Sequence, residues 1–289
     1  MRFRLLIKKN RLFLFIATSV LLILFFYWQN NDITITNIQY SNEKIPEAFQ
    51  GFKILQISDL HNKEFGQNQA KLMKLTRKIK PDIIAVTGDL IDSHRTNINI
   101  SMDYIRQAVK IAPVYFVTGN HEKWSDEHAE LNKQLLEAGT VILDNQALLL
   151  TRNKESIVLM GLDDSYPFTQ NEEINENLIE MVNSVSNQVP DKFRILLSHR
   201  PELIDLYAAN MIDLVFCGHA HGGQFRIPFV GGLYAPNQGF FPKYTNGVTL
   251  KNYTSMVVSR GLGNSVIPVR IFNRPELVVV TLNSKKQDK

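Results

Sequence analysis

The chain has 289 residues, of which 44% are hydrophobic and 21% are charged, a balance typical of a globular protein with a sizeable core. The net charge of +4 does not predict a nucleic-acid-binding surface, because the basic excess lies in residues 1–11 and the rest of the chain is close to neutral. The single cysteine, Cys217, excludes an intramolecular disulfide but does not decide the compartment.

An apolar run at residues 12–28 follows a basic N-terminal segment. As a helix it would be about 26 Å long, the short end of a bilayer span. Tyr27 and Trp28 end the run with the aromatic residues that membrane interfaces favour. The polar residues 29–32 offer no small-residue cleavage motif, so we expect an uncleaved anchor rather than a cleaved signal peptide. The basic flank predicts a cytoplasmic N-terminus, a single pass through the cell membrane and an extracytoplasmic domain.

Beyond this run, short apolar strands alternate with amphipathic helices. Strands are expected at 33–36, 52–58, 83–86, 114–117 and 141–143, and helices at 67–80, 99–111 and 125–138. Pro81 closes the first of these helices. Such alternation is typical of parallel strands joined by helices.

The second half of the chain has a different composition and becomes rich in glycine, proline and aromatic residues towards its end. The pattern predicts a β-hairpin over 147–160, helix–strand units before Ser198 and before Gly218, and strands at 256–258 and 277–281. We therefore expect an α/β fold with mixed sheets between helices.

The chain is expected to divide into three parts. Residues 1–30 form the basic segment and membrane anchor, residues 31–283 form one domain, and residues 284–289 form a disordered tail.

Five short polar clusters stand directly after predicted strands. They are Asp59-Leu60-His61, Gly88-Asp89, Gly119-Asn120-His121, Ser198-His199 and Gly218-His219-Ala220-His221-Gly222. Since ligands gather at the carboxyl edge of an α/β sheet, we expect the clusters to converge on one site. Their carboxylate, imidazole and amide groups suit a divalent metal such as Mn²⁺, Fe²⁺ or Zn²⁺.

Each cluster has an ordinary structural explanation when taken alone. An aspartate such as Asp59 or Asp89 is commonly a helix cap or turn residue, and a histidine such as His199 is commonly a hydrogen-bonded core residue. The clusters are informative together, because five of the seven histidines fall inside them. The joint pattern favours a metal site over five unrelated loops.

In this order, Asp-x-His, Gly-Asp, Gly-Asn-His, a lone His and Gly-His-x-His resemble the calcineurin-like metallophosphoesterase superfamily, with no block substituted. The similarity covers residues 33–282. Together with the anchor, the longer forms of these blocks resemble the membrane-associated bacterial branch, which includes UDP-diacylglucosamine pyrophosphatase-like and cell-wall phosphodiesterase-like proteins. The resemblance implies a four-layer αββα sandwich, in which two mixed sheets are flanked by helices.

The resemblance also implies two divalent-metal positions joined by a bridging carboxylate. The implied ligands are Asp59, His61 and His221 for one metal, Asn120, His199 and His219 for the other, and Asp89 for both. His121 would protonate the departing oxygen or stabilise the transition state, beside Asp89 and Asn120 in the catalytic group. Two Mn²⁺ ions are expected first, although Fe²⁺ and Zn²⁺ accept the same ligands.

The expected activity is hydrolysis of a phosphodiester or pyrophosphate at the cell envelope, on a lipid- or nucleotide-linked phosphate. The alternatives are a phosphomonoesterase acting on small extracellular phosphates and an inactive metal-bound membrane scaffold. The partners expected are the phosphoester and the membrane, without nucleic acid, and the sequence leaves the oligomeric state open.

Two further groups of residues have open interpretations. The aromatic residues Phe225, Phe229, Tyr234, Phe240 and Phe241 would either line a lipid or nucleoside pocket or pack the core of the second sheet. The arginines Arg200, Arg260 and Arg270 would either contact a substrate phosphate or form surface ion pairs.

Overall fold

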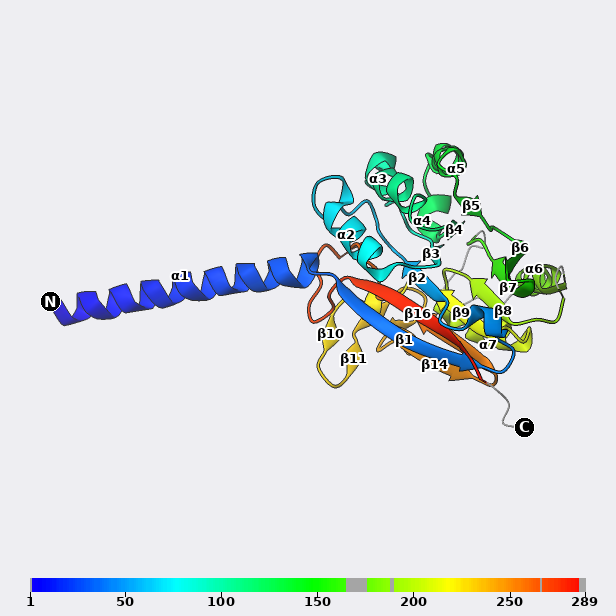
Figure 1. Cartoon of the computed structure of the whole chain (residues 1–289). Helices are drawn as coiled ribbons and strands as arrows, with labels where there is room; N and C mark the ends of the chain where they lie inside the picture. Colours follow the sequence, from blue (N-terminus) through cyan, green and yellow to red (C-terminus); the bar gives the residue numbers. More distant parts are fainter. Residues whose placement is uncertain (1, 165–175, 188–189, 266, 286–289) are drawn as a thin grey trace.

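The computed structural model describes residues 2–164, 176–187, 190–265 and 267–285. Helix α1 (Arg2–Asn31) projects from the body of the protein as one uninterrupted rod (Figure 1). Its stretch Lys9–Asn31 is long and apolar enough to cross a membrane, judged by length and composition alone, and a signal sequence would pass the same test. Almost none of this stretch is buried against the rest of the chain.

One six-stranded sheet has the strand order β1-β16-β2-β3-β4-β5. Its strands are β1 (Thr34–Asn42), β16 (Glu276–Ser284), β2 (Lys53–Ile57), β3 (Ile83–Thr87), β4 (Val114–Val117) and β5 (Val141–Ile142). Strands β2 to β5 are parallel to one another, β16 is antiparallel to β2, and the edge strand β1 is parallel to β16. The sheet is therefore mixed, with a parallel centre.

The other six-stranded sheet has the order β14-β15-β9-β8-β7-β6. Its strands are β14 (Gly247–Lys251), β15 (Thr254–Val258), β9 (Leu214–Cys217), β8 (Arg194–Leu197), β7 (Glu155–Gly161) and β6 (Gln146–Arg152). The four central strands are parallel, and the edge strands β14 and β6 pair antiparallel with their neighbours. Strands β6 and β7 form the expected hairpin.

Helices cover the outer face of each sheet. The first sheet is covered by α2 (Ala70–Ile79), α3 (Ile98–Ala108) and α5 (His128–Glu137), and the second by α6 (Glu176–Asn187) and α7 (Ile204–Ala209). The inner faces pack against each other through side chains such as Ile54 and Phe216. Along β2, Ile54 therefore faces the other sheet while Leu55 and Ile57 face the helices, so the strand is apolar on both sides. The predicted αββα sandwich is confirmed.

Several boundaries differ from the sequence-based expectation. The helix expected over 125–138 is α5, which is slightly shorter than predicted, and a short helix that the sequence did not predict, α4 (Asn120–Lys123), precedes it inside the Gly119-Asn120-His121 cluster. The first strand is longer than expected, because β1 pairs along its whole length with β16. Ser284, assigned to the tail by the sequence, is the last residue of β16. The rest of the predicted disordered tail, apart from Lys285, lies outside the described residues.

The end of α1 is attached to the body by a polar junction. Gln29 is buried, and its side-chain oxygen accepts a hydrogen bond from the backbone N–H of Asn273 at 3.3 Å. The side-chain oxygen of Asn30 accepts the backbone N–H of Arg270 at 2.8 Å, and its backbone carbonyl accepts the ammonium of Lys63. The polar residues that follow the apolar run are therefore built into the domain.

Candidate metal centre

The five polar clusters meet at the carboxyl edges of the two sheets. Asp59 and Asp89 lie just past β2 and β3, and Asn120 lies in α4 directly after β4. His199 follows β8, and His219 and His221 follow β9. The seven residues predicted as ligands are all buried, with exposures of 5% or less. The parallel centres of both sheets therefore direct these side chains into one place.

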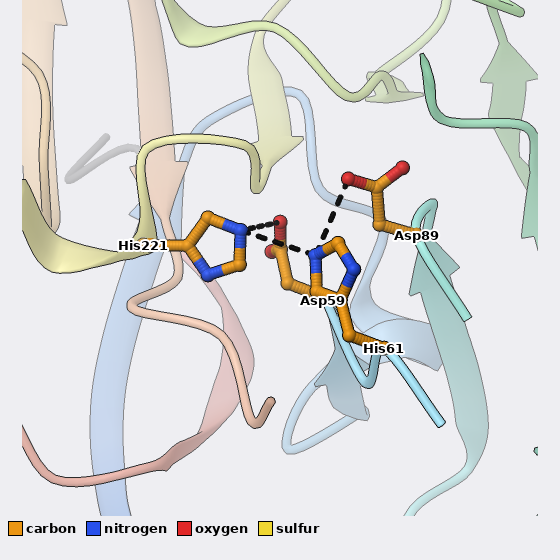
Figure 2. A group of neighbouring side chains, drawn as sticks. All are labelled: Asp59, His61, Asp89 and His221. Atoms are coloured by element: carbon orange, nitrogen blue, oxygen red, sulfur yellow. Dashed lines mark hydrogen bonds and ion pairs between the residues drawn. The ribbon is translucent and has the colours of Figure 1, made fainter. Parts of the chain in front are cut away.

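Figure 2 shows the first group of converging side chains, Asp59, His61, Asp89 and His221. The Nε2 atoms of His61 and His221 lie 3.1 Å apart. His61 Nε2 is 3.5 Å from Asp89 Oδ2, and His221 Nε2 is 3.5 Å from Asp59 Oδ1. The potential ligand atoms in this group all lie within 4.8 Å of one another.

A second group contains Asp89, His199 and His219, with Asn120 beside them. His199 Nε2 is 3.2 Å from Asp89 Oδ2, 3.1 Å from Asn120 Oδ1 and 3.2 Å from His219 Nδ1. The same Asp89 oxygen thus faces both groups. The structure brings together each set of residues that the resemblance assigned to one metal.

The chemistry of these atoms fits divalent cations. Two neutral imidazoles whose Nε2 atoms face each other can form one hydrogen bond only if one ring donates, whereas a cation accepts lone pairs from both. Nitrogen and oxygen ligands with no thiolate suit Mn²⁺, Fe²⁺ and Zn²⁺. These two groups of side chains suit a centre of two divalent metals.

The two aspartates have opposite pKa shifts. Burial raises the pKa of Asp59 to about 6, with the charge of Asp89 adding to the rise and His199 opposing it. Burial would also raise the pKa of Asp89, but His199, together with His121 and His61, holds it well below its usual range. Asp89 is therefore the carboxylate that stays ionised between the two groups.

The histidines also differ from one another. Burial lowers the pKa of His61 to about 3 despite the nearby carboxylates, and it lowers those of His219 and His221 well below their usual range. Burial acts in the same direction on His199, but Asp89 outweighs it and raises the pKa of His199 to about 10. Three of these imidazoles are thus neutral at pH 7, the form that binds a metal.

His121 lies beside the first group and is held by hydrogen bonds at both ring nitrogens. Its Nδ1 accepts the backbone N–H of Ser93 at 3.1 Å, and its Nε2 is 3.2 Å from Ser265 Oγ. Because a backbone N–H can only donate, the neutral ring carries its proton on Nε2. His121 also donates its backbone N–H to Asp89 Oδ1 at 2.9 Å. Its ring is therefore oriented to donate a proton from Nε2.

The loops that carry the ligands are backbone-strained. Most of the predicted ligands adopt left-handed φ angles, namely Asp59 at 51°, His61 at 46°, Asp89 at 54°, His219 at 64° and His221 at 47°. Such conformations cost about 1 kcal/mol or more for a non-glycine residue and cluster at functional sites. The sharp turns aim consecutive polar residues at the site.

Two glycines allow these loops to approach one another. At Gly119, a Cβ atom would lie 2.4 Å from Asp89 Oδ1, and at Gly88 it would lie 2.7 Å from the Cα of Gly119 and from His199 Nδ1. Gly88 also has a φ of +81°. The glycines in the sequence clusters thus make room for the ligands next to them.

Several supporting residues were not found from the sequence. Glu122 is fully buried, and it accepts the backbone N–H groups of Asp89 at 2.7 Å, Gly119 at 2.8 Å and Ile91 at 3.1 Å. Burial raises the pKa of Glu122 to about 8, and the charge of Asp89 adds to the rise. The only sequence signal for this role was its position two residues after Asn120.

Another supporting group lies on the side of the second metal group. Asn237 Oδ1 is 3.0 Å from His219 Nε2, and it accepts a hydrogen bond from Arg200 at 2.9 Å. Arg200 is buried and donates from Nε to both carboxylate oxygens of Asp164, at 2.7 and 2.9 Å. No motif marked Asn237 or Asp164 in the sequence.

The surface ion-pair interpretation is wrong for Arg200 and Arg270, and contact with a substrate phosphate stays a prediction. The ion pair of Arg200 is internal, and Arg270 is buried and donates mainly to backbone carbonyls, including those of Gly263 and Arg260. Arg260 forms a partly buried ion pair with Glu276 at 3.0 Å. Each of the three arginines forms hydrogen bonds or an ion pair that hold a loop or a strand end in place around the site.

The aromatic residues also follow neither interpretation as a group. Phe229, Phe240 and Phe241 are strongly exposed, so packing in the core of the second sheet is wrong for them. Tyr234 lines a hollow at the metal centre, as the pocket interpretation expected.

One hollow opens onto the metal centre, and a second lies beside it. One, of about 290 Å³, is bordered by Asp89 and His121 together with apolar or aromatic residues that include Trp124, Tyr234 and Ile267. The other, of about 430 Å³, is bordered by His61 and by the basic residues Lys63 and Arg95. One hollow thus contains aromatic side chains, and the other contains basic side chains.

Comparison with known proteins agrees with this arrangement. The family model described as calcineurin-like phosphoesterase matches residues 52–223. The chain is 31% identical over 264 residues to the uncharacterized metallophosphoesterase YkuE of Bacillus subtilis, covering 89% of this chain and 88% of that one. It is 27% identical over 236 residues to phosphodiesterase YaeI of Escherichia coli, covering 80% and 82% of the two chains.

A relative from Danio rerio, named transmembrane protein with metallophosphoesterase domain, is 25% identical over 261 residues, covering 86% of this chain and 57% of that protein. The matched family region spans β2 to β9 and contains every predicted ligand. The expected enzyme class, a phosphoester hydrolase, is confirmed, and the chain belongs to the calcineurin-like phosphoesterase family.

Proposed function

We propose that this chain is a two-metal phosphodiesterase or pyrophosphatase that acts at the cell envelope, on a lipid- or nucleotide-linked phosphate. The observation that carries the proposal is the pair of hollows, one at the metal centre and one beside it. A phosphomonoester has one substituent and needs one hollow, whereas a diester or pyrophosphate has a group on each side of the bond that is cleaved. The two hollows favour the second kind of substrate.

The residues of the site would divide the chemistry between them. Two divalent cations, with Mn²⁺ expected first, would be held by the seven predicted ligands, and they would acidify a water molecule and neutralise charge on the phosphoryl oxygens. Asp89, ionised and facing both groups, would join the two positions. His121 would donate its Nε2 proton to the departing oxygen or stabilise developing charge there.

The basic hollow would receive the part of the substrate that keeps further negative charge. Lys63 lies in this hollow, and burial, with Arg270 nearby, lowers the pKa of its ammonium to about 7. A bound phosphate would favour the charged form of this ammonium. The partly apolar hollow beside His121 would receive the leaving group.

The membrane anchor would place this chemistry at the envelope. Lys9–Asn31 fits a bilayer span, and Gln29 and Asn30 at its end bond to the loop that carries Asn273 and Arg270. This attachment favours an anchor that stays on the domain over a cleaved signal peptide. The basic N-terminal flank favours a cytoplasmic N-terminus with the domain outside.

The test combines metal analysis with turnover of the purified full chain. We expect about two metal ions per chain, and faster hydrolysis of a nitrophenyl diester and of lipid-linked pyrophosphates than of a nitrophenyl monoester. Asp89→Asn should lower metal content and abolish turnover more severely than His61→Ala, because Asp89 faces both metal groups.

Asp205→Asn is the matched control, since this aspartate is 62% exposed and pairs on the surface with Lys251. It should keep metal and rate. Preference for the monoester would favour the phosphomonoesterase, and metal binding without turnover would favour the scaffold. Wild-type metal content in Asp89→Asn would contradict the bridging assignment.

A further inference from the structure

An exposed apolar surface lies at the end of the body where α1 is attached. We call it the apolar rim, and it consists of Ile227, Phe229, Val230 and Phe272. The first three belong to the hairpin of β10 (Arg226–Ile227) and β11 (Gly231–Gly232). Phe229 at the hairpin tip is fully exposed, and the other three side chains are between 41% and 63% exposed.

The apolar rim is continuous with the membrane helix. Phe272 packs edge-on against Phe25 of α1, with ring centroids 5.7 Å apart. It also borders one hollow of about 340 Å³ together with the tip of the hairpin, from Arg226 to Gly231. A backbone hydrogen bond of 3.0 Å from Arg226 to Ile271 joins the two segments. In Figure 1 the hairpin and α1 are at the same end of the body.

The segment of the chain that carries the rim is basic. The sequence from residue 214 to residue 275 contains no aspartate or glutamate, although basic residues such as Arg226 and Arg274 occur throughout it. A surface that combines aromatic side chains with cations matches a bilayer that exposes lipid phosphates, although Arg274 also pairs with Asp32.

Two residues of the rim have strained backbone conformations, although their side chains are exposed and gain little from packing. Phe229 has a φ of 67° and Phe272 a φ of 51°, in the left-handed region that bulky residues rarely occupy. Within the described part of the chain, Phe229 is covered by nothing. Strain of this kind at a fully exposed aromatic residue is typical of a side chain held ready for a partner.

We propose that the apolar rim enters the outer boundary of the bilayer that α1 spans, as a second membrane contact. This inference rests on the membrane anchor of the proposed function and adds a fixed orientation to it. A single helix would leave the body free to swing on its junction, whereas a second contact holds one end of the body on the membrane. The apolar side chains would lie at the level of the lipid headgroups, with Arg226 and Arg274 near the phosphates.

The test uses single fluorescent labels on the full chain in vesicles of phosphatidylcholine and phosphatidylglycerol. Cys217, the only native cysteine, is buried, so a new surface cysteine takes the label selectively. Val230→Cys reports the rim and leaves Phe229 in place. Phe15→Cys, at an exposed position of α1, reports the anchor.

Tyr253→Cys is the matched control for an exposed aromatic position away from the rim. Tyr253 is 89% exposed and lies near the end of β1 opposite to the end that α1 enters, about 30 Å away along the strand. Vesicles with nitroxide-bearing lipids quench a label at the bilayer, and aqueous iodide quenches a label in water.

We expect nitroxide lipids to quench the label at position 230 at least about threefold more strongly than the label at 253, and iodide to show the reverse order. Adding Phe229→Asp should remove the lipid quenching at 230 and leave that at 15 unchanged. The label at position 15 reports the membrane anchor independently. If the label at 230 is not quenched by lipid, the label at 15 therefore shows whether the anchor or only the second contact has failed.

Quenching by lipid at 15 but not at 230 would overturn the second contact and leave the anchor intact. Absence of lipid quenching at 15 would overturn both. Protection of position 230 from iodide without any quenching by lipid would mean that another protein surface, such as a second copy, covers the rim, and would also overturn the proposal.

Discussion

Asp59 and Asp89 are both buried at the metal centre, but their carboxyl groups have opposite electrostatic surroundings. Ionised Asp59 is stabilised in the metal-free fold mainly by the charge of His199, and to a smaller extent by hydrogen bonds from Ser58 and from the backbone N–H of His219. Its pKa nevertheless rises from 3.8 to about 6, which corresponds to about 3 kcal/mol. Without metal, the charge on Asp59 therefore works against folding.

The sign of this effect gives a stability prediction. Because the folded-state pKa lies above the unfolded value, the metal-free fold should lose stability as the pH rises from about 4 to about 6, and the loss should be complete at neutral pH. Asp59→Asn should therefore be more stable than wild type in chelator at pH 7.5, by up to about 3 kcal/mol. With excess Mn²⁺ the order should reverse, because the variant lacks a ligand.

Thermal unfolding of wild type and Asp59→Asn, with chelator and with Mn²⁺, measures which protein is more stable under each condition. Asp205→Asn serves again as the control and should shift neither curve. A variant that is less stable than wild type in chelator would show that the attraction of His199 and the hydrogen bonds of the Asp59 carboxylate outweigh the cost of burying its charge.

His121 gives a prediction about rate rather than stability. If it donates from Nε2 to the leaving group, His121→Ala should keep both metals and lose rate by about 10²–10⁴-fold on an ester with a poor leaving group. Nitrophenolate needs little protonation, so nitrophenyl esters should be affected least. Metal stoichiometry and rates across esters of graded leaving-group pKa measure the effect. A uniform loss of rate together with metal depletion would mean that His121 only supports the loop carrying Asn120.

At the residue scale, the sequence identified site residues that belong to short motifs. It did not identify residues that are far from these motifs in the chain and contact them only in the folded protein. Asp59 and His61 stand two positions apart directly after a strand, so both their type and their place were visible. Asn237 reaches His219 across 18 positions from a segment without a motif, and Asp164 reaches Arg200 across 36. Those contacts depend on loop conformations that no local pattern encodes.

The loop between β15 and β16 connects the metal centre to the membrane helix. Gly263 donates its backbone N–H to the carbonyl of Asp59 at 2.6 Å, and Arg270 bonds to Asn30 at the end of α1. Arg270 holds the loop together by donating to the carbonyls of Gly263, Arg260 and Asn273. Burial lowers the pKa of this guanidinium to about 10, and it remains charged at neutral pH.

Arg270→Met should release these carbonyls and loosen the support behind Asp59. We expect metal affinity to fall about 10-fold or more, as for other residues that orient ligands. Arg270→Lys should not restore it, because one ammonium cannot reproduce the spread of a guanidinium fork. Arg274→Met is the control, since Arg274 pairs with Asp32 and stacks on Trp28 away from the ligands. Metal titration of the four proteins decides, and wild-type affinity in Arg270→Met would contradict the role of the loop.

The elements themselves were largely predictable where burial sets the pattern. Strands such as β3 are buried on both faces and read as continuous apolar runs, so their positions were clear. The boundaries depended on pairing instead. Most of β1 is polar and its second half alternates in exposure, and only its pairing with β16, more than 230 residues later, makes it a long strand. Long-range pairing of this kind leaves no local signal.

At the scale of the whole molecule, hydrogen bonds connect the end of α1 to the loops beside the candidate metal centre. The polar end of α1 bonds to the same loop that contacts Asp59, and the basic hollow at His61 includes Lys63, whose ammonium also bonds to Asn30. The bilayer that α1 would span therefore lies close to the basic hollow beside the site. This proximity supports a substrate that is itself held at the membrane.

The orientation of the chain in the membrane is testable in cells. Basic residues precede the apolar run, no cleavage motif follows it, and Gln29 and Asn30 are built into the domain. We therefore expect the full-length chain in the membrane fraction, with its body outside the cytoplasm. Protease added to intact cells or spheroplasts should digest the body and leave a short membrane-embedded fragment, while a cytoplasmic marker protein stays intact. Complete protection that is lost only on permeabilisation would mean that the body faces the cytoplasm. A shortened soluble form would mean that the helix is removed, although removal would break the bonds between Asn30 and the loop behind the metal centre.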